Sequence, residues 1–223
     1  FHLIVAAILK TIILRPKLNR FVANKNNYQR NSYSASFVVK KQFNDTSEEG
    51  LAFIYATEGS TLDSLHEDLF KQISREKKCG AGNATSNTMD ILNKLPHWFV
   101  KFFIWLMRQL DRHGIVPKAI IEADPYYASV ILSNLGSIKL RSGYHHLTNW
   151  GTTSLFVVVG EMKERIFRNE NGEDEYRNSV DLGLTIDERL ADGYYYSKSV
   201  RLLKYILEHP ECLERPFSEP VDY

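Results

Sequence analysis

The sequence predicts an α/β fold in which a mixed β-sheet is covered by helices. Three observations support this class: helical and β-rich segments are both present, most predicted strands follow one another in sequence, and no strand–helix unit repeats. The 223 residues fit one domain with a sizeable core, and we find no internal repeat and no low-complexity linker. We therefore predict a single domain over residues 1–223.

The first third of the chain alternates helices with short strands. Residues 2–14 are apolar and predict a helix that ends before Pro16, because proline disfavours helical geometry in the residue before it. An amphipathic helix is predicted over 60–78, where leucines recur at helical spacing after a cap-like Ser60 or Thr61. Three segments rich in β-branched and aromatic residues, separated by the turn-forming "NKNN" and "NDTSEEG", predict strands of a hairpin or meander: 20–24, 33–41 and 51–56.

The most apolar helix is predicted in the middle of the chain. A short helix over 88–94 leads into it, Pro96 marks its start and Gly114 its end. Its apolar part, 98–110, is shorter than the about 20 residues that span a bilayer, and basic residues interrupt it. We predict that this helix lies over the core or at an oligomer interface, and we expect no membrane contact. An interfacial membrane anchor and a wall for an acyl chain are the alternatives.

The last part of the chain contains strands and one long helix. "YYASVILSNLGSI" (126–138) predicts a strand running into a turn, and "TTSLFVVVGEM" (152–162) predicts the next strand. "NENGEDE" (169–175) is typical of a hairpin tip and precedes the strand "RNSVDLGLTID" (177–187). A helix over 194–208 follows, with an apolar face for the core.

Charge and cysteine content narrow the classes of partner. A net charge of +1 gives no concentrated basic face for phosphates, so we expect no nucleic-acid partner. Cys79 and Cys212 lack metal-ligand or redox spacing and are typical of a reducing compartment, which predicts a cytoplasmic location. The apolar N-terminal run is interrupted by charge and lacks a cleavage site, so we interpret it as a buried helix whose preceding elements are missing.

Three passages resemble a known family of acyltransferases. "FHLIVAAILKTIILRPKLN" (1–19) resembles the early helix and the Pro-x-x-Asn turn of the catalytic domain of dihydrolipoyl acyltransferases from 2-oxo acid dehydrogenase complexes. "VILSNLGSI" (130–138) resembles the strand and Ser-Asn-x-Gly turn of that domain, and "IDERLADG" (186–193) resembles its Asp-His-Arg-x-x-Asp-Gly motif. Chloramphenicol acetyltransferase is a more distant relative. The resemblance implies a chloramphenicol acetyltransferase-like two-layer sandwich and, since no lipoyl domain is visible, a stand-alone relative.

The resemblance also implies roles for individual residues. In the family, the motif histidine removes a proton from a thiol or hydroxyl, which then attacks an acyl thioester. A serine in the Ser-Asn-x-Gly turn stabilises the oxyanion. By match, Ser133 is the oxyanion donor, Asp192 the mainly structural motif aspartate that orients the site, and Gly193 the motif glycine. Glu188 stands where the family has its histidine.

Glutamate in place of the histidine is a weaker base for the acceptor, unless its surroundings raise its pKa. Proton transfer from a free thiol is about 2 pKa units uphill to histidine and about 4 to glutamate, a difference of about 3 kcal/mol. Burial of a carboxylate can recover much of this loss. Three interpretations of Glu188 remain open: an altered base, a remnant in a catalytically inactive trimeric binding or scaffold protein, and a metal ligand with Asp192. The last lacks the partners of a specific metal site, so we expect no metal.

The resemblance places further groups at the site and implies its surroundings. We expect Asn134, Gly193, His145 and His146 to bind substrate, although adjacent histidines in such a loop are also typical of surface or structural residues. The acyl donor is a coenzyme A thioester, a substrate rather than a bound cofactor, and the acceptor is a small molecule with a thiol, hydroxyl or amine. The family is trimeric, so a homotrimer is expected, in which Glu188 of one subunit faces Ser133 of its neighbour.

Overall fold

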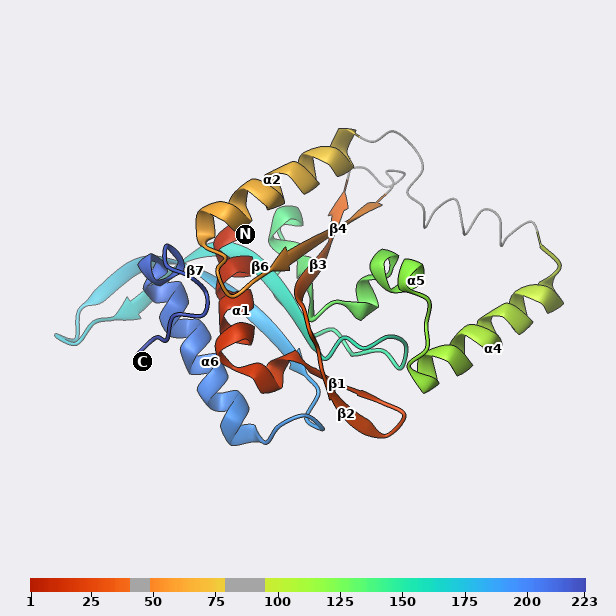
Figure 1. The fold of residues 1–223 in the computed structure, drawn as a ribbon. Coiled ribbons are helices and arrows are strands. Elements are labelled where there is room, and N and C mark those ends of the chain that lie inside the picture. The colour runs from red at the N-terminus through yellow and green to blue at the C-terminus, as the bar shows by residue number, and fades with distance from the viewer. Residues whose placement is uncertain (41–48, 79–94) are drawn as a thin grey trace.

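The centre of the molecule is a five-stranded mixed sheet in the order β4-β3-β5-β6-β7 (Figure 1). The computed structural model describes residues 1–40, 49–78 and 95–223, so the predicted helix over 88–94 and Cys79 lie outside the described residues. The three inner strands run parallel, and each edge strand pairs antiparallel with its neighbour. The bounds are β3 Tyr33–Lys40, β4 Glu49–Ala56, β5 Val130–Asn134, β6 Leu155–Arg168 and β7 Asp174–Ile186. The predicted mixed α/β sheet is confirmed.

A separate hairpin follows the first helix. Its strands are β1 (Arg20–Ala23) and β2 (Asn26–Gln29), joined by a two-residue turn. Asn24 and Lys25 both have positive φ, 46° and 63°, as in the turns that best match strand twist. The predicted turn is confirmed at these two residues. It is wrong for Asn26 and Asn27, which pair in β2 because the hairpin ladder satisfies their backbone groups.

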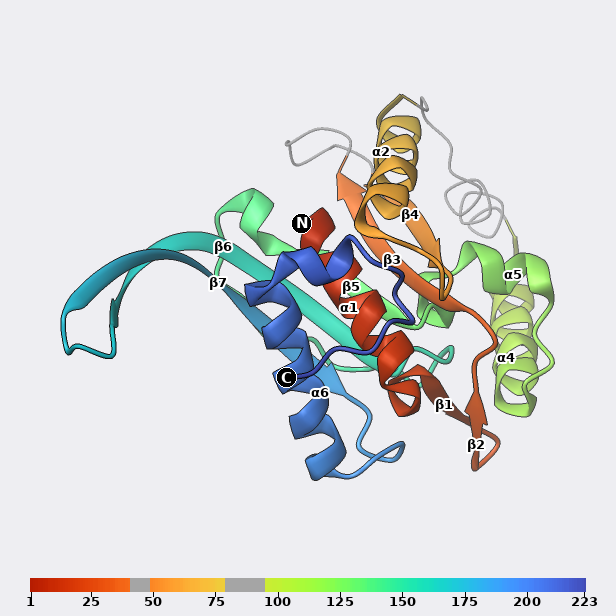
Figure 2. The same ribbon diagram turned by 60° about the vertical axis from the view of Figure 1, so that its left-hand side comes forward.

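Three helices cover one face of the sheet (Figure 2). They are α1 (His2–Leu14), α2 (Leu62–Lys78) and α6 (Gly193–Glu208), and all three match predicted segments. The helix-facing side chains of the strands meet α1 and α6 in one apolar core. This arrangement is the predicted two-layer sandwich.

The first helix, α1, lies at the centre of this core. Every residue of α1 from Val5 to Ile13 is buried, including Lys10, which is 1% exposed. The Lys10 ammonium donates hydrogen bonds to the carbonyl oxygens of Cys212 (2.8 Å) and Pro216 (3.0 Å) near the C-terminus. Burial lowers the pKa of Lys10. The two carbonyls therefore tie the first helix to the last segment of the chain.

The opposite face of the sheet carries only a thin layer. A small apolar cluster there consists of Ile131, Phe156 and Val158, with Leu135 and Leu147 against it. Short turns and loops between β5 and β6, including the 3-10 helix η3 (Leu135–Ile138), cover this cluster. This outer face is the one that carries the serine turn.

The helix α4 (His97–His113) stands at the edge of the molecule, and a short helix α5 (Lys118–Ala123) follows it (Figure 1). Gly114 ends α4 in the left-handed conformation, as predicted. The prediction that this helix lies over the core is wrong, because α4 has no buried residue. One side of α4 meets the protein, where Asp111 accepts the Tyr127 hydroxyl, and this contact leaves most of its apolar side chains exposed. The other predicted place, an oligomer interface, stays a prediction. None of the described helices is long and apolar enough to cross a membrane.

We predict that Lys10→Met lowers the free energy of unfolding by about 1–3 kcal/mol, because two carbonyls lose a charged donor while the buried volume is kept. Urea denaturation checks this. Lys204→Met, at a side chain that is 75% exposed on α6, is the matched control and is expected to change stability by less than about 0.5 kcal/mol. Equal urea midpoints for the two variants would show that the buried ammonium contributes nothing.

Candidate functional site

The motif turn between β7 and α6 presents Glu188 at its tip. The Asp187 N–H donates to the Ser154 carbonyl oxygen (3.0 Å), and the Leu190 N–H donates back to the Asp187 carbonyl oxygen (3.2 Å). Leu190 is 5% exposed and anchors the turn in the protein. Glu188 itself is exposed. The chain therefore holds the backbone of Glu188 while leaving its carboxylate open to a second molecule.

Asp187 and Arg189, the neighbours of Glu188, form a bidentate ion pair. The Arg189 guanidinium donates from Nε to Oδ1 of Asp187 (2.8 Å) and from Nη2 to Oδ2 (2.6 Å). Burial raises the pKa of Asp187, but the hydrogen bonds from Arg189 outweigh it and hold the pKa of this carboxyl below its ordinary value. Because Asp187 is already paired, Glu188 is the carboxylate of this turn that remains open.

Tyr196 supports the turn from the following helix. Its hydroxyl donates to the Asp187 carbonyl oxygen at 2.5 Å. Burial, followed by the negative charge of Asp187, raises the pKa of Tyr196 to about 12. The phenol therefore stays protonated at neutral pH and keeps donating to the turn.

The last two motif residues begin α6. An Asp192 carboxylate oxygen accepts a hydrogen bond from the Tyr195 backbone N–H (2.8 Å), which makes Asp192 the N-cap of this helix. A Cβ added to Gly193 would have no atom within 4 Å, and Gly193 is not among the residues with positive φ. Neither packing nor backbone conformation within the chain requires glycine there. The geometry gives Asp192 a structural role and leaves the face of Gly193 open.

The serine turn lies on the outer face of the sheet. Ser133 pairs with Val158 in the neighbouring strand and is half-buried. Asn134 ends β5, and its carbonyl oxygen accepts a hydrogen bond from the Ser137 hydroxyl (2.8 Å), which closes the turn. The Ser-Asn-x-Gly passage thus forms the predicted strand followed by a tight turn.

Ser133 and Glu188 do not meet within one chain. Ser133 pairs with Val158, Val158 pairs with Gly183, and Glu188 lies five residues beyond Gly183. At ordinary strand rise and spacing this separates the two backbones by about 16 Å along the strands and about 10 Å across them. A site that uses both residues therefore needs a second chain.

The histidine pair lies on the same face as Ser133. The His145 ring stacks on Phe156 with centroids 4.2 Å apart, and Phe156 shares its face with Val158, the partner of Ser133. Nδ1 of His145 lies 2.9 Å from the His146 carbonyl oxygen and donates to it in the tautomer with the proton on Nδ1. In that tautomer, Nε2 of the exposed His145 ring can accept a hydrogen bond.

Two glycines let the histidine segment approach the sheet. A Cβ on Gly160 would lie 2.5 Å from the Ser142 nitrogen, and one on Gly183 would lie 1.9 Å from the Gly143 oxygen. Any side chain at these positions would push the segment away from β6 and β7. These contacts fix the height of His145 above the sheet.

A cleft of about 770 Å³ opens beside the motif turn. It lies between the tip of the β1–β2 hairpin, the end of α4, the loop 148–152 and Arg189. Lys25, Arg108 and Arg112 supply positive charge. The one acidic side chain in its lining, Asp111, already accepts hydrogen bonds from the Tyr127 hydroxyl (2.7 Å) and the Gly151 N–H (3.3 Å). The cleft is therefore suited to a negatively charged ligand.

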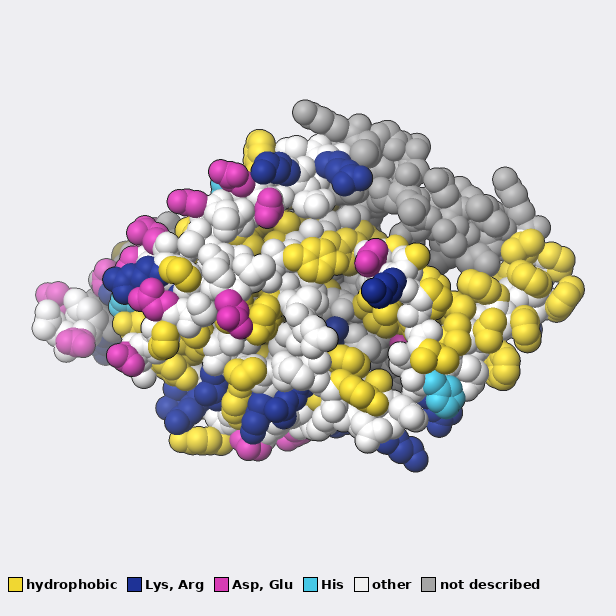
Figure 3. Space-filling view, viewed as in Figure 1, with side chains coloured by type: hydrophobic (Ala, Val, Ile, Leu, Met, Phe, Trp, Pro, Cys, Tyr) yellow, Lys and Arg dark blue, Asp and Glu magenta, His cyan; other side chains and the backbone are white. Residues whose placement is uncertain are grey.

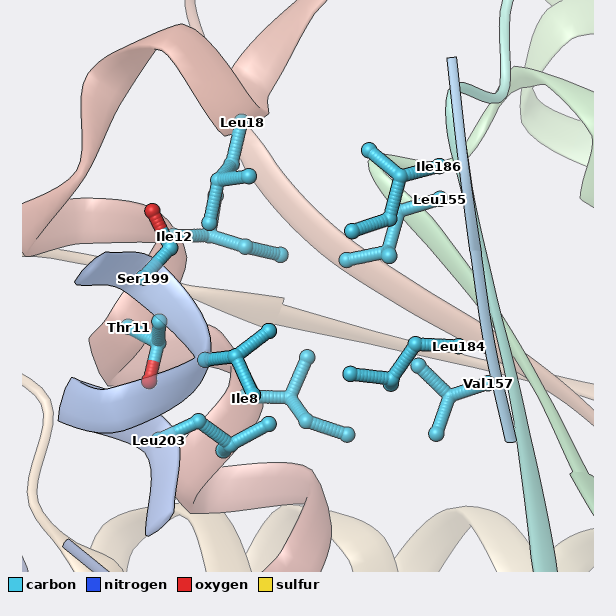
Figure 4. A pocket seen from close by; sticks show the side chains of 11 residues that line it. Ile8, Thr11, Ile12, Leu18, Leu155, Val157, Leu184, Ile186, Ser199 and Leu203 are labelled. Atoms are coloured by element: carbon cyan, nitrogen blue, oxygen red, sulfur yellow. The ribbon is translucent and has the colours of Figure 1, made fainter. Parts of the chain in front are cut away.

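A second pocket has a different character. It encloses about 30 Å³ between α1, α6 and the strands β6 and β7 (Figure 4). Aliphatic side chains such as Ile8, Leu184 and Leu203 line it, and the Thr11 hydroxyl is turned to the Ala7 carbonyl oxygen (2.7 Å). An apolar space of this size stays dry. It is a packing void on the face opposite Ser133.

Sequence reasoning identified both turns but missed the cleft. Lys25, Arg108 and Arg112 come from segments far apart in sequence, so no local pattern joins them. The part that Arg189 plays could have been predicted from the sequence, because it stands two residues after Asp187 within the motif itself. No group of three or more His, Cys, Asp or Glu in the described ranges is arranged to hold a metal ion.

Several solved structures with a similar fold are acyltransferases. A probable dihydrolipoamide acetyltransferase from Listeria monocytogenes superposes with a TM-score of 0.62 and 14% identity, over 94% of this chain and 70% of that one. Dihydrolipoamide acetyltransferase from Azotobacter vinelandii gives 0.57 and 12%, over 94% and 70% of the two chains. A chloramphenicol acetyltransferase gives 0.52 and 12%, over 93% and 77%. No family model matches the sequence, and neither does any curated protein.

The chain has the chloramphenicol acetyltransferase-like fold. Its structural neighbours are the two groups of acyltransferases that the three sequence passages resemble, so the resemblance is confirmed at the level of the fold. The roles of individual site residues remain predictions.

We predict that Asp192→Ala lowers the free energy of unfolding by about 1 kcal/mol, because α6 loses its N-cap. Asp192→Asn keeps an oxygen that can accept the Tyr195 N–H and is expected to stay near the parent value. Chemical denaturation of both variants checks this. If both lose the same stability, the charge of Asp192 matters more than its capping hydrogen bond.

Proposed function

We propose that this protein transfers an acyl group from a coenzyme A thioester to a thiol, hydroxyl or amine of a small acceptor. The observation that carries the proposal is the pair of half-sites: Ser133 and Glu188 sit on rigid turns, both reach solvent, and they are too far apart to meet within one chain. The acyltransferase fold of the neighbours supports the reaction class. The complete site would form between subunits of a homotrimer.

The reaction would use each half-site for one task. The Glu188 carboxylate takes the proton of the acceptor while the acceptor atom bonds to the thioester carbonyl carbon. The Ser133 hydroxyl donates a hydrogen bond to the carbonyl oxygen as it becomes negative. The carbon–sulfur bond then breaks, coenzyme A leaves as a thiolate, and the proton held by Glu188 passes to that sulfur.

The remaining predicted residues would surround these two. Nε2 of His145 can accept a hydrogen bond from a substrate on the outer face, with His146 beside it. Asn134 follows Ser133 in β5 and stays a predicted substrate-binding residue. The open space at Gly193 would let a substrate or a second chain approach the start of α6. Asp192 would orient the site by capping that helix.

The basic cleft supports coenzyme A as the donor. Phosphate groups need several cations within reach, and Lys25, Arg108 and Arg112 line the cleft whose rim includes Arg189 of the motif. A ligand whose phosphates lie in this cleft could extend its thioester past the motif turn. No bound metal is required for any step.

The Azotobacter vinelandii enzyme offers a direct parallel. Its structure was determined to investigate a serine, a histidine and an asparagine in its catalytic mechanism, and the last two stand four positions apart. Glu188 and Asp192 have the same separation here. In the proposed assignment, Glu188 takes the place of the histidine and acts as a base whose surroundings a partner subunit completes.

The alternative is a catalytically inactive trimeric binding or scaffold protein of the same fold. The exposure of Glu188 favours it, since within one chain nothing removes water from this carboxylate. A hydrated carboxylate is a weak base for a thiol. Both hypotheses assume the same fold and the same trimer. They differ only in whether the protein turns over an acyl-coenzyme A substrate.

We predict that the parent protein releases free thiol from acetyl-coenzyme A with dihydrolipoamide or with an amine or alcohol acceptor. Glu188→Gln is expected to lower the rate by about a hundredfold or more, because the amide cannot take the proton. Glu188→His is expected to raise it near neutral pH, since proton transfer gains about 3 kcal/mol of driving force. Glu170→Gln, at the hairpin tip, is the matched control. If neither the parent nor any variant releases thiol, the result favours the catalytically inactive binding or scaffold protein.

We predict that chains carrying Ser133→Ala and Glu188→Gln restore each other when co-expressed. In a mixed trimer, about a quarter of the interfaces pair an intact Glu188 with an intact Ser133, so about a quarter of the parent activity should return. Activity assays on the co-purified mixture check this, and each variant alone is the control. No recovery, with trimers confirmed by light scattering, would show that one chain supplies both residues or that neither matters.

A further inference from the structure

The outward face of α4 is an exposed aromatic stripe. Trp98 is 71% exposed, Phe102 54% and Trp105 55%, and α4 has no buried residue among its 17. These three and Leu106 follow the spacing i, i+4, i+7 and i+8, which places them on one side of the helix. Phe102 and Trp105 stack with centroids 5.9 Å apart. Apolar side chains gather over this edge of the molecule (Figure 3).

This stripe is not the side of α4 that faces the protein. Val100, Phe103, Met107 and Leu110 are partly covered and lie on the other side of the helix. Asp111 lies on that side as well, where it accepts the Tyr127 hydroxyl. The helix therefore has two apolar faces, and the described residues cover only one of them.

The charge beside the stripe is positive. Lys101, Arg108 and Arg112 are all exposed, and helical spacing groups them along one border of the stripe. Asp111 is the sole acidic residue of α4, and it is turned inward. The outward face thus combines tryptophan and phenylalanine with basic side chains and presents no negative charge.

We propose that the outward face of α4 binds the surface of a bilayer that contains anionic lipids. Tryptophan and phenylalanine partition into the interfacial region, and lysine and arginine attract anionic headgroups, so a helix of this composition lies in the plane of the membrane. At a rise of 1.5 Å per residue, the helix offers a contact about 25 Å long. Because α4 stands at the edge of the molecule, it can meet a flat surface without displacing the sheet or the core (Figure 1).

The charges favour a membrane over a twofold pairing of two α4 faces. Pairing two such faces about a twofold axis would bring the same basic borders together, and like charges in an interface disfavour that contact. Anionic headgroups complement these borders instead. The aromatic stripe shares no residue with the motif turn or the serine turn. Arg108 and Arg112 also line the basic cleft, so the test uses the two tryptophans and Lys101, which stand outside that lining.

The test is sedimentation of the full chain with vesicles of phosphatidylcholine, alone or mixed with phosphatidylserine. We expect binding to the mixed vesicles, weaker binding to phosphatidylcholine alone, and release by added salt. Trp98→Ser combined with Trp105→Ser is expected to lower the partition coefficient by about tenfold or more. Lys101→Glu, at a residue outside the lining of the basic cleft, should weaken binding to the mixed vesicles and leave binding to phosphatidylcholine alone unchanged. Tyr176→Ser, at another exposed aromatic residue, is the control and should bind as the parent does.

Tryptophan fluorescence gives a second readout. Two of the three tryptophans lie on the stripe, while the Trp150 indole donates to Asp124 (2.6 Å) elsewhere. Mixed vesicles should shift the parent emission to shorter wavelength and leave the doubly substituted variant, with Trp150 alone, unchanged. Absence of binding to either vesicle would overturn the proposal. Concentration-dependent self-association that the double substitution abolishes, without vesicle binding, would also overturn it and assign the stripe to a second copy.

Discussion

The burial of the Lys10 ammonium against two carbonyl oxygens is the interaction on which the arrangement of the core depends. A charge in an apolar helix is tolerated inside a protein only when hydrogen bonds replace its water. Cys212 and Pro216 provide them, so the C-terminal segment has to close over α1. Once α1 is enclosed, α6 is held beside it and against the sheet. The start of α6 and the turn that carries Glu188 are placed as a result.

The two faces of the sheet have different roles. Helices and a dense apolar core fill one face, whereas the outer face carries a thin layer that glycines bring close to the strands. Polar side chains collect on the thin side: Ser133 and the histidine pair. A rigid sheet backed by a full core keeps such groups in place while it leaves them accessible. The small apolar pocket between α1, α6 and the sheet lies on the face opposite Ser133.

The proposed role of Glu188 as a base depends on its surroundings in an assembled protein. An exposed carboxylate is a weak base, and a carboxylate that a partner chain desolvates is a stronger one. Asp187 and Arg189 are paired with each other, so the surroundings of Glu188 depend on what docks against the turn. In the proposed intersubunit site, the contact that completes the site would also change the strength of its base.

The amino-acid sequence by itself determined the class of fold, the position of nearly every helix and strand, and the two turns that carry Ser133 and Glu188. These features follow from local periodicity, capping residues and turn residues such as Pro16, Gly114 and Asp192, which act within a few neighbours. Only the tertiary structure decided that α4 is uncovered, that Lys25 and Arg112 share a cleft, and that Ser133 and Glu188 lie apart. These are contacts between distant segments, and local preference carries no information about which surfaces the folded chain leaves open.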